Sequence, residues 1–253
     1  MAVAVRVVAC LDVHDGKVTK GVKFQGNVDV GDPLQLARKY DTELIDELVF
    51  YDITASAESR RSVVDLIQDT SDQIFIPFTV GGGVSEVEDF DRLLRAGADK
   101  ISVNSGAIRD PSLIRRAAGR FGSQCVVLSV DGRRAAHAPS GFEVTSHGGR
   151  RDTGLDLLEW VQEGQRLGAG EIVVNSMDAD GTRSGFDLEM LSAVREVSSV
   201  PVVASGGAGT PEHFVEAIRV GADAVLAAGI FHSGDVSVAE VKATIRSAGF
   251  AVR

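Results

Sequence analysis

The sequence is poor in cysteine and has no cluster of residues that bind metals. Its 253 residues include two cysteines, Cys10 and Cys125, and both lie in apolar runs. Two such cysteines give no disulfide framework, and the five scattered histidines lack the spacing of a metal site. We therefore expect buried, reduced thiols, no metal and no cofactor.

Positive charge and long apolar runs are also scarce. The chain has 26 Lys and Arg against 36 Asp and Glu, a net charge of −10, which argues against nucleic acid as a partner. A small phosphorylated ligand stays open, because backbone N–H groups at helix starts hold phosphate. No apolar run reaches about 18 residues, which argues against a membrane span. The N-terminus has no basic region or clear cleavage site, so we expect a cytoplasmic protein.

What is present is a regular alternation of short β-branched runs with helical patterns. Helical segments such as Val87–Ala96 and Glu212–Val220 follow most of the runs. Alternation of this kind predicts parallel strands, and eight units in this length fit one (β/α)8 TIM barrel domain over residues 1–253. The predicted strands are Val5–Leu11, Glu47–Tyr51, Pro77–Val80, Lys100–Val103, Cys125–Val130, Glu171–Asn175, Val200–Ala204 and Ala224–Ala228.

The chain also repeats itself. IPFTVGGGVSEVEDFDRLLRAGADKISVNSGAI, from Ile76, aligns without a gap with VPVVASGGAGTPEHFVEAIRVGADAVLAAGIF, from Val200, at an offset of 124 residues. The repeat predicts two half-barrels related by a twofold axis. Two separate domains are the alternative, which we disfavour because four βα units cannot close a barrel and no linker separates the halves.

In this fold the active site lies at the carboxyl ends of the strands. Asp12 closes the first predicted strand and Asp131 the fifth, at equivalent places in the two halves. Either aspartate alone fits a loop start, but a symmetric pair across the barrel mouth favours a general acid and a general base. If Asp12 points inward, strand alternation predicts that Arg6 and Cys10 do too.

Glycine-rich strand ends predict two phosphate sites. Gly81–Gly83 and Ser205–Gly207 follow the third and seventh strands, while Asn104–Ser105 and Ala228–Gly229 follow the fourth and eighth. A phosphate site after the last two strands is frequent in this fold, and the repeat predicts a second one. The substrate would then carry a phosphate at each end.

Two loops offer further contacts with the substrate. DADGTRSG, which follows the sixth strand, offers Asp180 and Gly181, although a simple turn also fits. Between Asp12 and Asp32 we expect a long structureless loop that is either a lid with Lys20 over a phosphate or a solvated basic loop.

At the opposite end of the barrel, four charged residues begin predicted strands. Buried charges must be paired, so two bases and two acids predict a neutral ring across the floor. Taken alone, such a ring is most simply a structural plug. The four residues are Arg6, Glu47, Lys100 and Glu171.

These motifs together resemble a known family. VACLDVHDGKVTKG, ELVFYDITAS, FTVGGGV, GADKISVN, DADGTRSG and VVASGGAG are similar, in this order, to the cyclase subunits of imidazole glycerol phosphate synthase from histidine biosynthesis. The resemblance runs from about residue 5 to the end. It implies a (β/α)8 barrel that converts an open-chain bis-phosphorylated ribonucleotide (PRFAR) and ammonia to imidazole glycerol phosphate and AICAR.

The resemblance also assigns roles to residues. It implies that Asp12 and Asp131 are the acid/base pair, without saying which is which, and that Lys20 belongs to a loop closing on the substrate. One phosphate falls to Gly83, Asn104 and Ser105, and the other to Asp180, Gly181, Gly207, Ala228 and Gly229. Gly229 stands where the family often has serine, which removes a hydroxyl, and Ser105 stands where threonine is common.

For the charged residues at the barrel floor, the resemblance implies a gate in place of a structural plug. Arg6, Glu47, Lys100 and Glu171 match a charged gate for ammonia. The ammonia would come from a separate glutaminase subunit docked at this face, near Asp99 and Lys100.

Two other functions compete. The sister isomerase of the same pathway is also a half-barrel repeat with two aspartates and two phosphate sites, but DITAS and the ACLDV start favour the cyclase. A non-catalytic binding barrel is disfavoured because both Asp12 and Asp131 are present.

Overall fold

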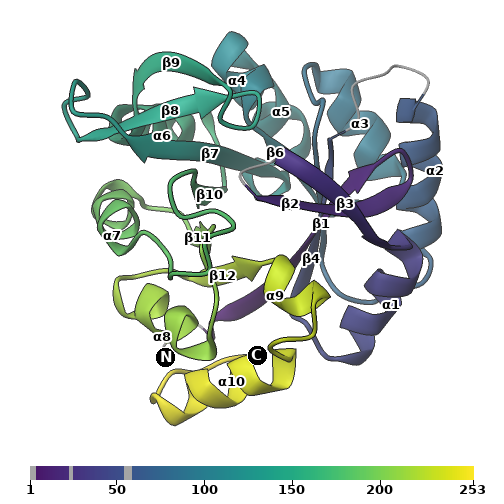
Figure 1. The fold of residues 1–253 in the computed structure, drawn as a ribbon. Helices are drawn as coiled ribbons and strands as arrows, with labels where there is room; N and C mark the ends of the chain where they lie inside the picture. The colour runs from purple at the N-terminus through teal and green to yellow at the C-terminus, as the bar shows by residue number, and fades with distance from the viewer. Residues whose placement is uncertain (1–3, 23–24, 54–58) are drawn as a thin grey trace.

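The computed structural model describes residues 4–22, 25–53 and 59–253, and within them eight parallel strands close into a barrel (Figure 1). The strand order is β1-β4-β5-β6-β7-β10-β11-β12, and β12 pairs with β1. The predicted TIM barrel is confirmed. The strands are β1 (Arg6–His14), β4 (Glu47–Asp52), β5 (Phe78–Gly81), β6 (Lys100–Val103), β7 (Val126–Arg134), β10 (Glu171–Ser176), β11 (Val202–Ser205) and β12 (Ala224–Ala227).

Helices between successive barrel strands form the outer layer (Figure 1). They begin at capping residues: Asp32 and Asp156, for example, accept hydrogen bonds from backbone N–H groups of the first turn. The helices are α1 (Pro33–Thr42), α2 (Ser59–Ser71), α3 (Val87–Arg95), α5 (Ser112–Phe121), α6 (Leu157–Leu167), α7 (Leu188–Val197), α8 (Pro211–Arg219) and α10 (Val238–Ser247), with the shorter α4 (Ser105–Arg109), α9 (Gly229–His232) and η1 (Ser123–Cys125).

Strand alternation divides the core into two parts. Val7, Ala9 and Leu11 of β1 face the helices and belong to the large cluster between sheet and helices. Val8 and Cys10 face the barrel interior, in a smaller cluster with Val49, Val127, Val173, Val203, Ala224 and Leu226. The inward parity predicted for the first strand is therefore confirmed, and it directs Asp12 toward the same side.

The internal repeat is visible in the backbone. The helix caps Glu86 and Thr210, related by the offset of 124, have φ/ψ of −137°/161° and −138°/162°. Each repeat contains the sequence Gly-Ala-Asp, at 97–99 and 221–223, and the two aspartates make the same contact. Asp99 accepts the Phe78 N–H at 2.8 Å, and Asp223 accepts the Val202 N–H at 2.9 Å. Both halves contribute to one closed sheet.

Two antiparallel ribbons were not predicted. The segment expected to be a structureless loop after Asp12 instead contains β2 (Lys17–Val22) and β3 (Gln25–Gly31), paired with the extended end of β1. A second ribbon, β8 (Phe142–Ser146) and β9 (Arg151–Asp156), pairs with the extended end of β7 and stands at the upper left of Figure 1. Consequently Asp12 and Asp131 do not end their strands as predicted, because the ribbons continue both strands past them.

Candidate active site

Asp131 lies inside the carboxyl end of the barrel and is buried. The side-chain amide of Asn104 donates to its carboxylate at 2.8 Å, and that of Asn175 donates at 3.2 Å. Burial and, to a smaller extent, the charge of Asp180 raise the pKa of Asp131, the two amide donors oppose the shift, and the resulting pKa is about 6. Asp131 can therefore exchange a proton near neutral pH.

Asp12 occupies the corresponding place in the first half. It pairs with Tyr51 of β4 on one side and with Thr19 of β2 on the other, and it is half-buried. The Cys10 thiol, two residues earlier on the same face of the strand, lies 3.8 Å from the Asp12 carboxylate. Both aspartates thus stand where a barrel strand leaves the closed sheet and enters a ribbon.

The glycine turns after β5 and β11 are matched in the two halves. Gly82 and Gly83 have φ of +96° and +64°, and Gly206 and Gly207 have φ of +85° and +105°. At Gly82 and Gly207 a Cβ would lie 2.0 Å from a carbonyl oxygen, that of Asp52 or Gly185. Glycine is therefore required at these positions by conformation and by the close approach of a neighbouring loop.

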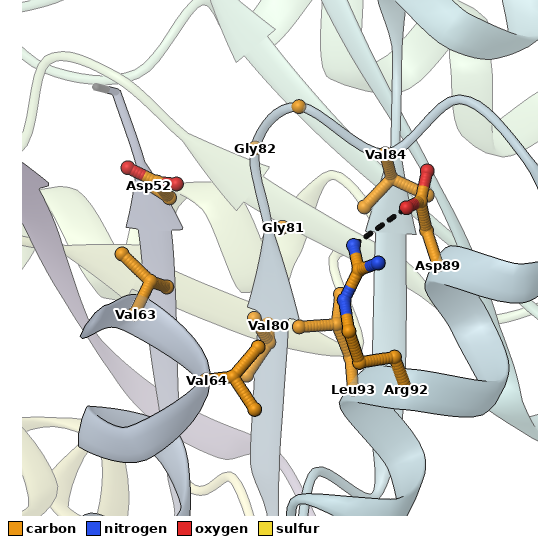
Figure 2. Close-up of a pocket in the computed structure, with 11 residues that line it drawn as sticks. Asp52, Val63, Val64, Val80, Gly81, Gly82, Val84, Asp89, Arg92 and Leu93 are labelled. Carbon is orange, nitrogen blue, oxygen red and sulfur yellow. Dashed lines mark hydrogen bonds and ion pairs between the residues drawn. The ribbon is translucent and has the colours of Figure 1, made fainter. Parts of the chain in front are cut away.

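The chain that follows the glycine turn of β5 is fixed by a charged pair at the start of α3, Asp89 and Arg92 (Figure 2). Asp89 of α3 accepts the N–H groups of Ser85 and Glu86 at 2.8 and 3.0 Å and pairs with Arg92 at 2.6 Å. Beside it, a cavity of about 20 Å³ reaches from Asp52 to Leu93. That volume is enough for one water molecule and too small for a substrate, so this cavity is not the substrate site.

Short helices follow β6 and β12 with the same backbone geometry. Asn104 precedes α4 with φ/ψ of −128°/−87°, and Ala228 precedes α9 with −122°/−77°. The predicted residues Ser105 and Gly229 are the first residues of these helices. The Ser105 hydroxyl accepts the His147 N–H at 3.0 Å, so its own hydrogen is available to a ligand.

The DADGTRSG segment forms a turn after β10, next to the glycines of the second half. The Asp180 N–H donates to Ser176 O at 2.9 Å, Gly181 has φ of +73°, and the Gly185 N–H donates to Gly207 O at 2.8 Å. An open groove of about 540 Å³ adjoins this turn, between Arg134 and Glu189. Arg134 is already paired with Asp187 and Glu189.

The predicted Lys20 lies in β2, where its backbone pairs with that of Val28. Its side chain lies outside the described part of the chain, and so do residues 54–56 of the DITAS motif.

Within the described ranges, no group of three or more His, Cys, Asp or Glu side chains is arranged to hold a metal ion. In the same ranges no helix is long and apolar enough to cross a membrane.

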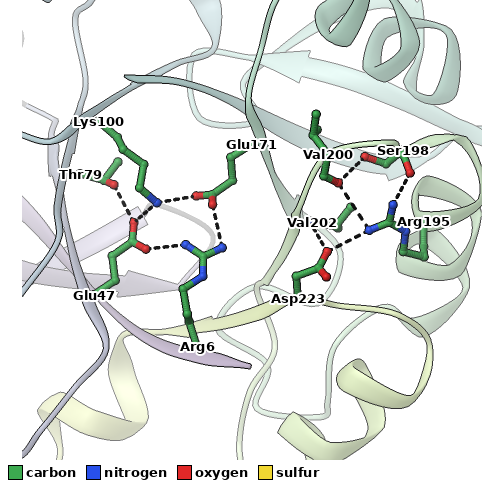
Figure 3. Close-up of polar contacts among 10 residues, drawn as sticks. All are labelled: Arg6, Glu47, Thr79, Lys100, Glu171, Arg195, Ser198, Val200, Val202 and Asp223. Atoms are coloured by element: carbon green, nitrogen blue, oxygen red, sulfur yellow. Dashed lines mark hydrogen bonds and ion pairs between the residues drawn. The ribbon is translucent and has the colours of Figure 1, made fainter. Parts of the chain in front are cut away.

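At the barrel floor the four predicted charged residues form a closed ring (Figure 3). Arg6 pairs with Glu47 and with Glu171, both at 2.7 Å, while Lys100 pairs with the same two carboxylates at 2.7 and 3.0 Å. The Thr79 hydroxyl also donates to Glu47 at 2.7 Å. Two cations and two anions alternate around the barrel axis, and none of their side chains is more than 16% exposed.

The structure adds polar residues that the sequence analysis did not single out. Asn175 holds Asp131, and the Tyr51 hydroxyl lies 3.3 Å from that of Ser102 and also interacts with Ser129. Strand alternation could have predicted that these side chains face the barrel interior. Asn175 lies on the same face of its strand as Glu171, and Ser102 lies on the same face as Lys100. Only the fold shows that these side chains meet.

Comparison with known proteins places this barrel in a family. The family model for histidine biosynthesis proteins matches residues 6–237. Proteins named imidazole glycerol phosphate synthase subunit HisF are similar along the whole chain: that of Thermobifida fusca is 57% identical over 256 residues, and that of Streptomyces coelicolor 58% over 253, each covering all of both chains. That of Corynebacterium urealyticum is 60% identical over 242 residues, 96% of each chain. The chain therefore belongs to the histidine biosynthesis protein family, among the HisF subunits of imidazole glycerol phosphate synthase.

Proposed function

We propose that this chain is the cyclase subunit of imidazole glycerol phosphate synthase and acts as a lyase. It would convert PRFAR and ammonia to imidazole glycerol phosphate and AICAR. The observation that carries the proposal is the buried Asp131, whose pKa of about 6 suits proton transfer near neutral pH, in a chain 57% identical to a subunit with this name. The relatives described above all carry the name of the synthase subunit, which favours the cyclase over the isomerase.

In this proposal Asp12 and Asp131 flank the bond-forming centre. Asp131 changes its protonation state in the working pH range, because burial raises its pKa and the amides of Asn104 and Asn175 keep its carboxylate in one orientation. Asp12 serves as the complementary group on the opposite strand. A pH profile then distinguishes the two roles: turnover that falls above about pH 6 makes Asp131 the acid, and turnover that rises makes it the base.

The two phosphates would bind at the two matched strand ends. Backbone N–H groups at helix starts and in left-handed turns hold anions, and the two halves present the same conformations. The Ser105 hydroxyl would donate to one phosphate, whereas its counterpart Gly229 has only its N–H, so the second site depends on Asp180, Gly181, Gly207 and Ala228. Asn104 also bonds to Asp131, which ties phosphate binding to the orientation of the carboxylate.

The floor ring would be the gate through which ammonia reaches these aspartates, and a separate glutaminase subunit would dock over it. Phe75, 92% exposed, and Leu44, 73% exposed, lie in the segments before β5 and β4, on the floor side of the barrel. They are two of the three exposed large hydrophobic residues found in the described part of the chain. Exposed apolar residues at the same end of the barrel as the ring would suit a protein interface.

The experiment that tests the function is turnover of the purified chain on PRFAR, with and without ammonium salt. We expect imidazole glycerol phosphate and AICAR only when ammonium is present. Conversion of the preceding aminoaldose to its ketose instead would make the protein the isomerase. Neither activity, with the substrate still bound, would make it a non-catalytic barrel.

A further inference from the structure

Three hydroxyl groups form a cluster inside the barrel, between the floor ring and Asp131. Tyr51, Gly81 and Ser102 lie side by side on β4, β5 and β6. The Tyr51 ring lies over Gly81, where a Cβ would come within 2.7 Å of the ring. Its hydroxyl therefore crosses β5 and reaches Ser102 at 3.3 Å and Ser129 of β7. Ser102 is 2% exposed and Ser129 8%.

The hydroxyl cluster lies next to an apolar part of the barrel interior. Immediately below it, the interior is lined with Val8, Val49, Val127 and Val173, and a buried hydroxyl in such a place costs free energy unless it is hydrogen-bonded. Each hydroxyl has one donor hydrogen and two acceptor lone pairs. Hydroxyls that bond mainly to one another therefore leave acceptor positions unused. A small molecule with several N–H or O–H donors would use them.

We propose that Tyr51, Ser102 and Ser129 form a binding station for ammonia between the floor ring and Asp131. The inference rests on the proposed function, since it takes ammonia to arrive through the barrel. Ammonia has three N–H donors and one lone pair, so it can donate to two hydroxyl oxygens and accept from the third.

The chemistry of the station suits the neutral molecule. Burial raises the pKa of the Tyr51 hydroxyl above its usual range, so the hydroxyl stays protonated and does not trap ammonium as an ion pair. The O–O distance of 3.3 Å between Tyr51 and Ser102 is long for a hydrogen bond between hydroxyls. Ammonia that binds between them therefore replaces only a weak hydrogen bond. In this role Tyr51 is a positioning residue, and Asp131 remains the group that acts on the substrate.

The test compares two sources of ammonia in the complete complex with a glutaminase subunit. In Tyr51→Phe, turnover supported by glutamine should fall about two- to tenfold, the loss of one hydrogen bond. Turnover with saturating ammonium, which reaches the substrate from the barrel mouth, should change much less. The ratio of glutamate formed to imidazole glycerol phosphate formed should rise above that of the wild type, because ammonia that is not bound at the station escapes before it reacts. Ser102→Ala and Ser129→Ala should shift both readouts in the same direction.

Tyr40→Phe is the matched control. It removes the other tyrosine hydroxyl of the chain, which bonds to His232 Nδ1 at 2.6 Å outside the barrel interior, and it should leave the ratio of the two activities unchanged. Equal losses with both ammonia sources in Tyr51→Phe, or no loss with either, would overturn the station while leaving the cyclase intact. A wild-type protein without cyclase activity would instead reject the proposed function itself.

Discussion

At the scale of single residues, the two aspartates make the most direct prediction. Replacing either Asp12 or Asp131 by Asn keeps the size of the side chain and removes the proton-transfer group, so turnover should fall at least about 100-fold. Steady-state rates with PRFAR and saturating ammonium measure this without the glutaminase. Full activity in both variants would show that neither carboxylate transfers a proton.

Asp131 also makes a prediction about stability. Its folded-state pKa of about 6 lies above the usual 3.8, so the folded protein binds this proton more tightly than the unfolded chain does. The resulting stabilisation is present below about pH 4 and is lost as pH rises to about 6. Asp131→Asn does not titrate, so its free energy of unfolding should improve relative to wild type by up to about 3 kcal/mol between pH 4 and 7.

Urea denaturation across this pH range measures the difference. Asp156→Asn is a suitable control: the hydroxyl and N–H of Ser140, together with N–H groups at the start of α6, outweigh the effect of burial and lower the pKa of Asp156. The stabilisation that the Asp156 carboxylate provides is present above the usual pKa of aspartate and is lost only as the pH falls below that value toward the lowered pKa of the folded state. The Asp156→Asn difference should therefore stay flat between pH 5 and 7, and a flat Asp131→Asn curve would mean that Asp131 titrates normally.

At the scale of elements, the glycine turns are the parts that substitution should disturb most. Gly207 and Gly234 both have positive φ, at +105° and +73°, so alanine strains both. At Gly207 the added Cβ would also meet Gly185 O at 2.0 Å, whereas at Gly234 no atom lies within 4 Å. Gly207→Ala should therefore cost about 1–3 kcal/mol more than Gly234→Ala.

The same pair of variants tests the second phosphate site. Because the clash displaces the turn that carries Asp180 and Gly181, Gly207→Ala should raise KM for PRFAR, and Gly234→Ala should not. Thermal unfolding and ammonium-supported kinetics give the two readouts. Equal stability of the two variants would show that the loop moves aside at no cost.

Elements also show where prediction from the sequence fell short. Most barrel strands agree with their predicted runs within two residues, because a buried parallel strand leaves a continuous apolar run. The ribbons β2–β3 and β8–β9 leave no such run. Their strands contain glycines and charged residues, and they are strands because extended backbones lie ready to pair at the ends of β1 and β7.

At the scale of the whole molecule, the floor ring connects strands that are far apart in the sequence. Arg6→Ala leaves two largely buried carboxylates with Lys100 as their remaining ring cation, which should cost about 3–5 kcal/mol of stability and leave the ring incomplete. We expect glutamine-supported turnover to fall more than ammonium-supported turnover. Arg6→Lys keeps the charge and should preserve more of the glutamine-supported activity than Arg6→Ala. Equal losses with the two ammonia sources would make the ring a structural plug.

The sequence by itself determined the barrel, its twofold repeat and the end of the barrel at which the two aspartates lie. These features follow from patterns along the chain: alternation of apolar residues, glycines at fixed spacing, and a copy of the same segment 124 residues later. Tertiary structure decided what those side chains experience. The raised pKa of Asp131, the closed ring of Arg6, Glu47, Lys100 and Glu171, and the meeting of Tyr51 with Ser102 and Ser129 all depend on contacts between different strands. Burial and charge act through space, so only the closed barrel sets them.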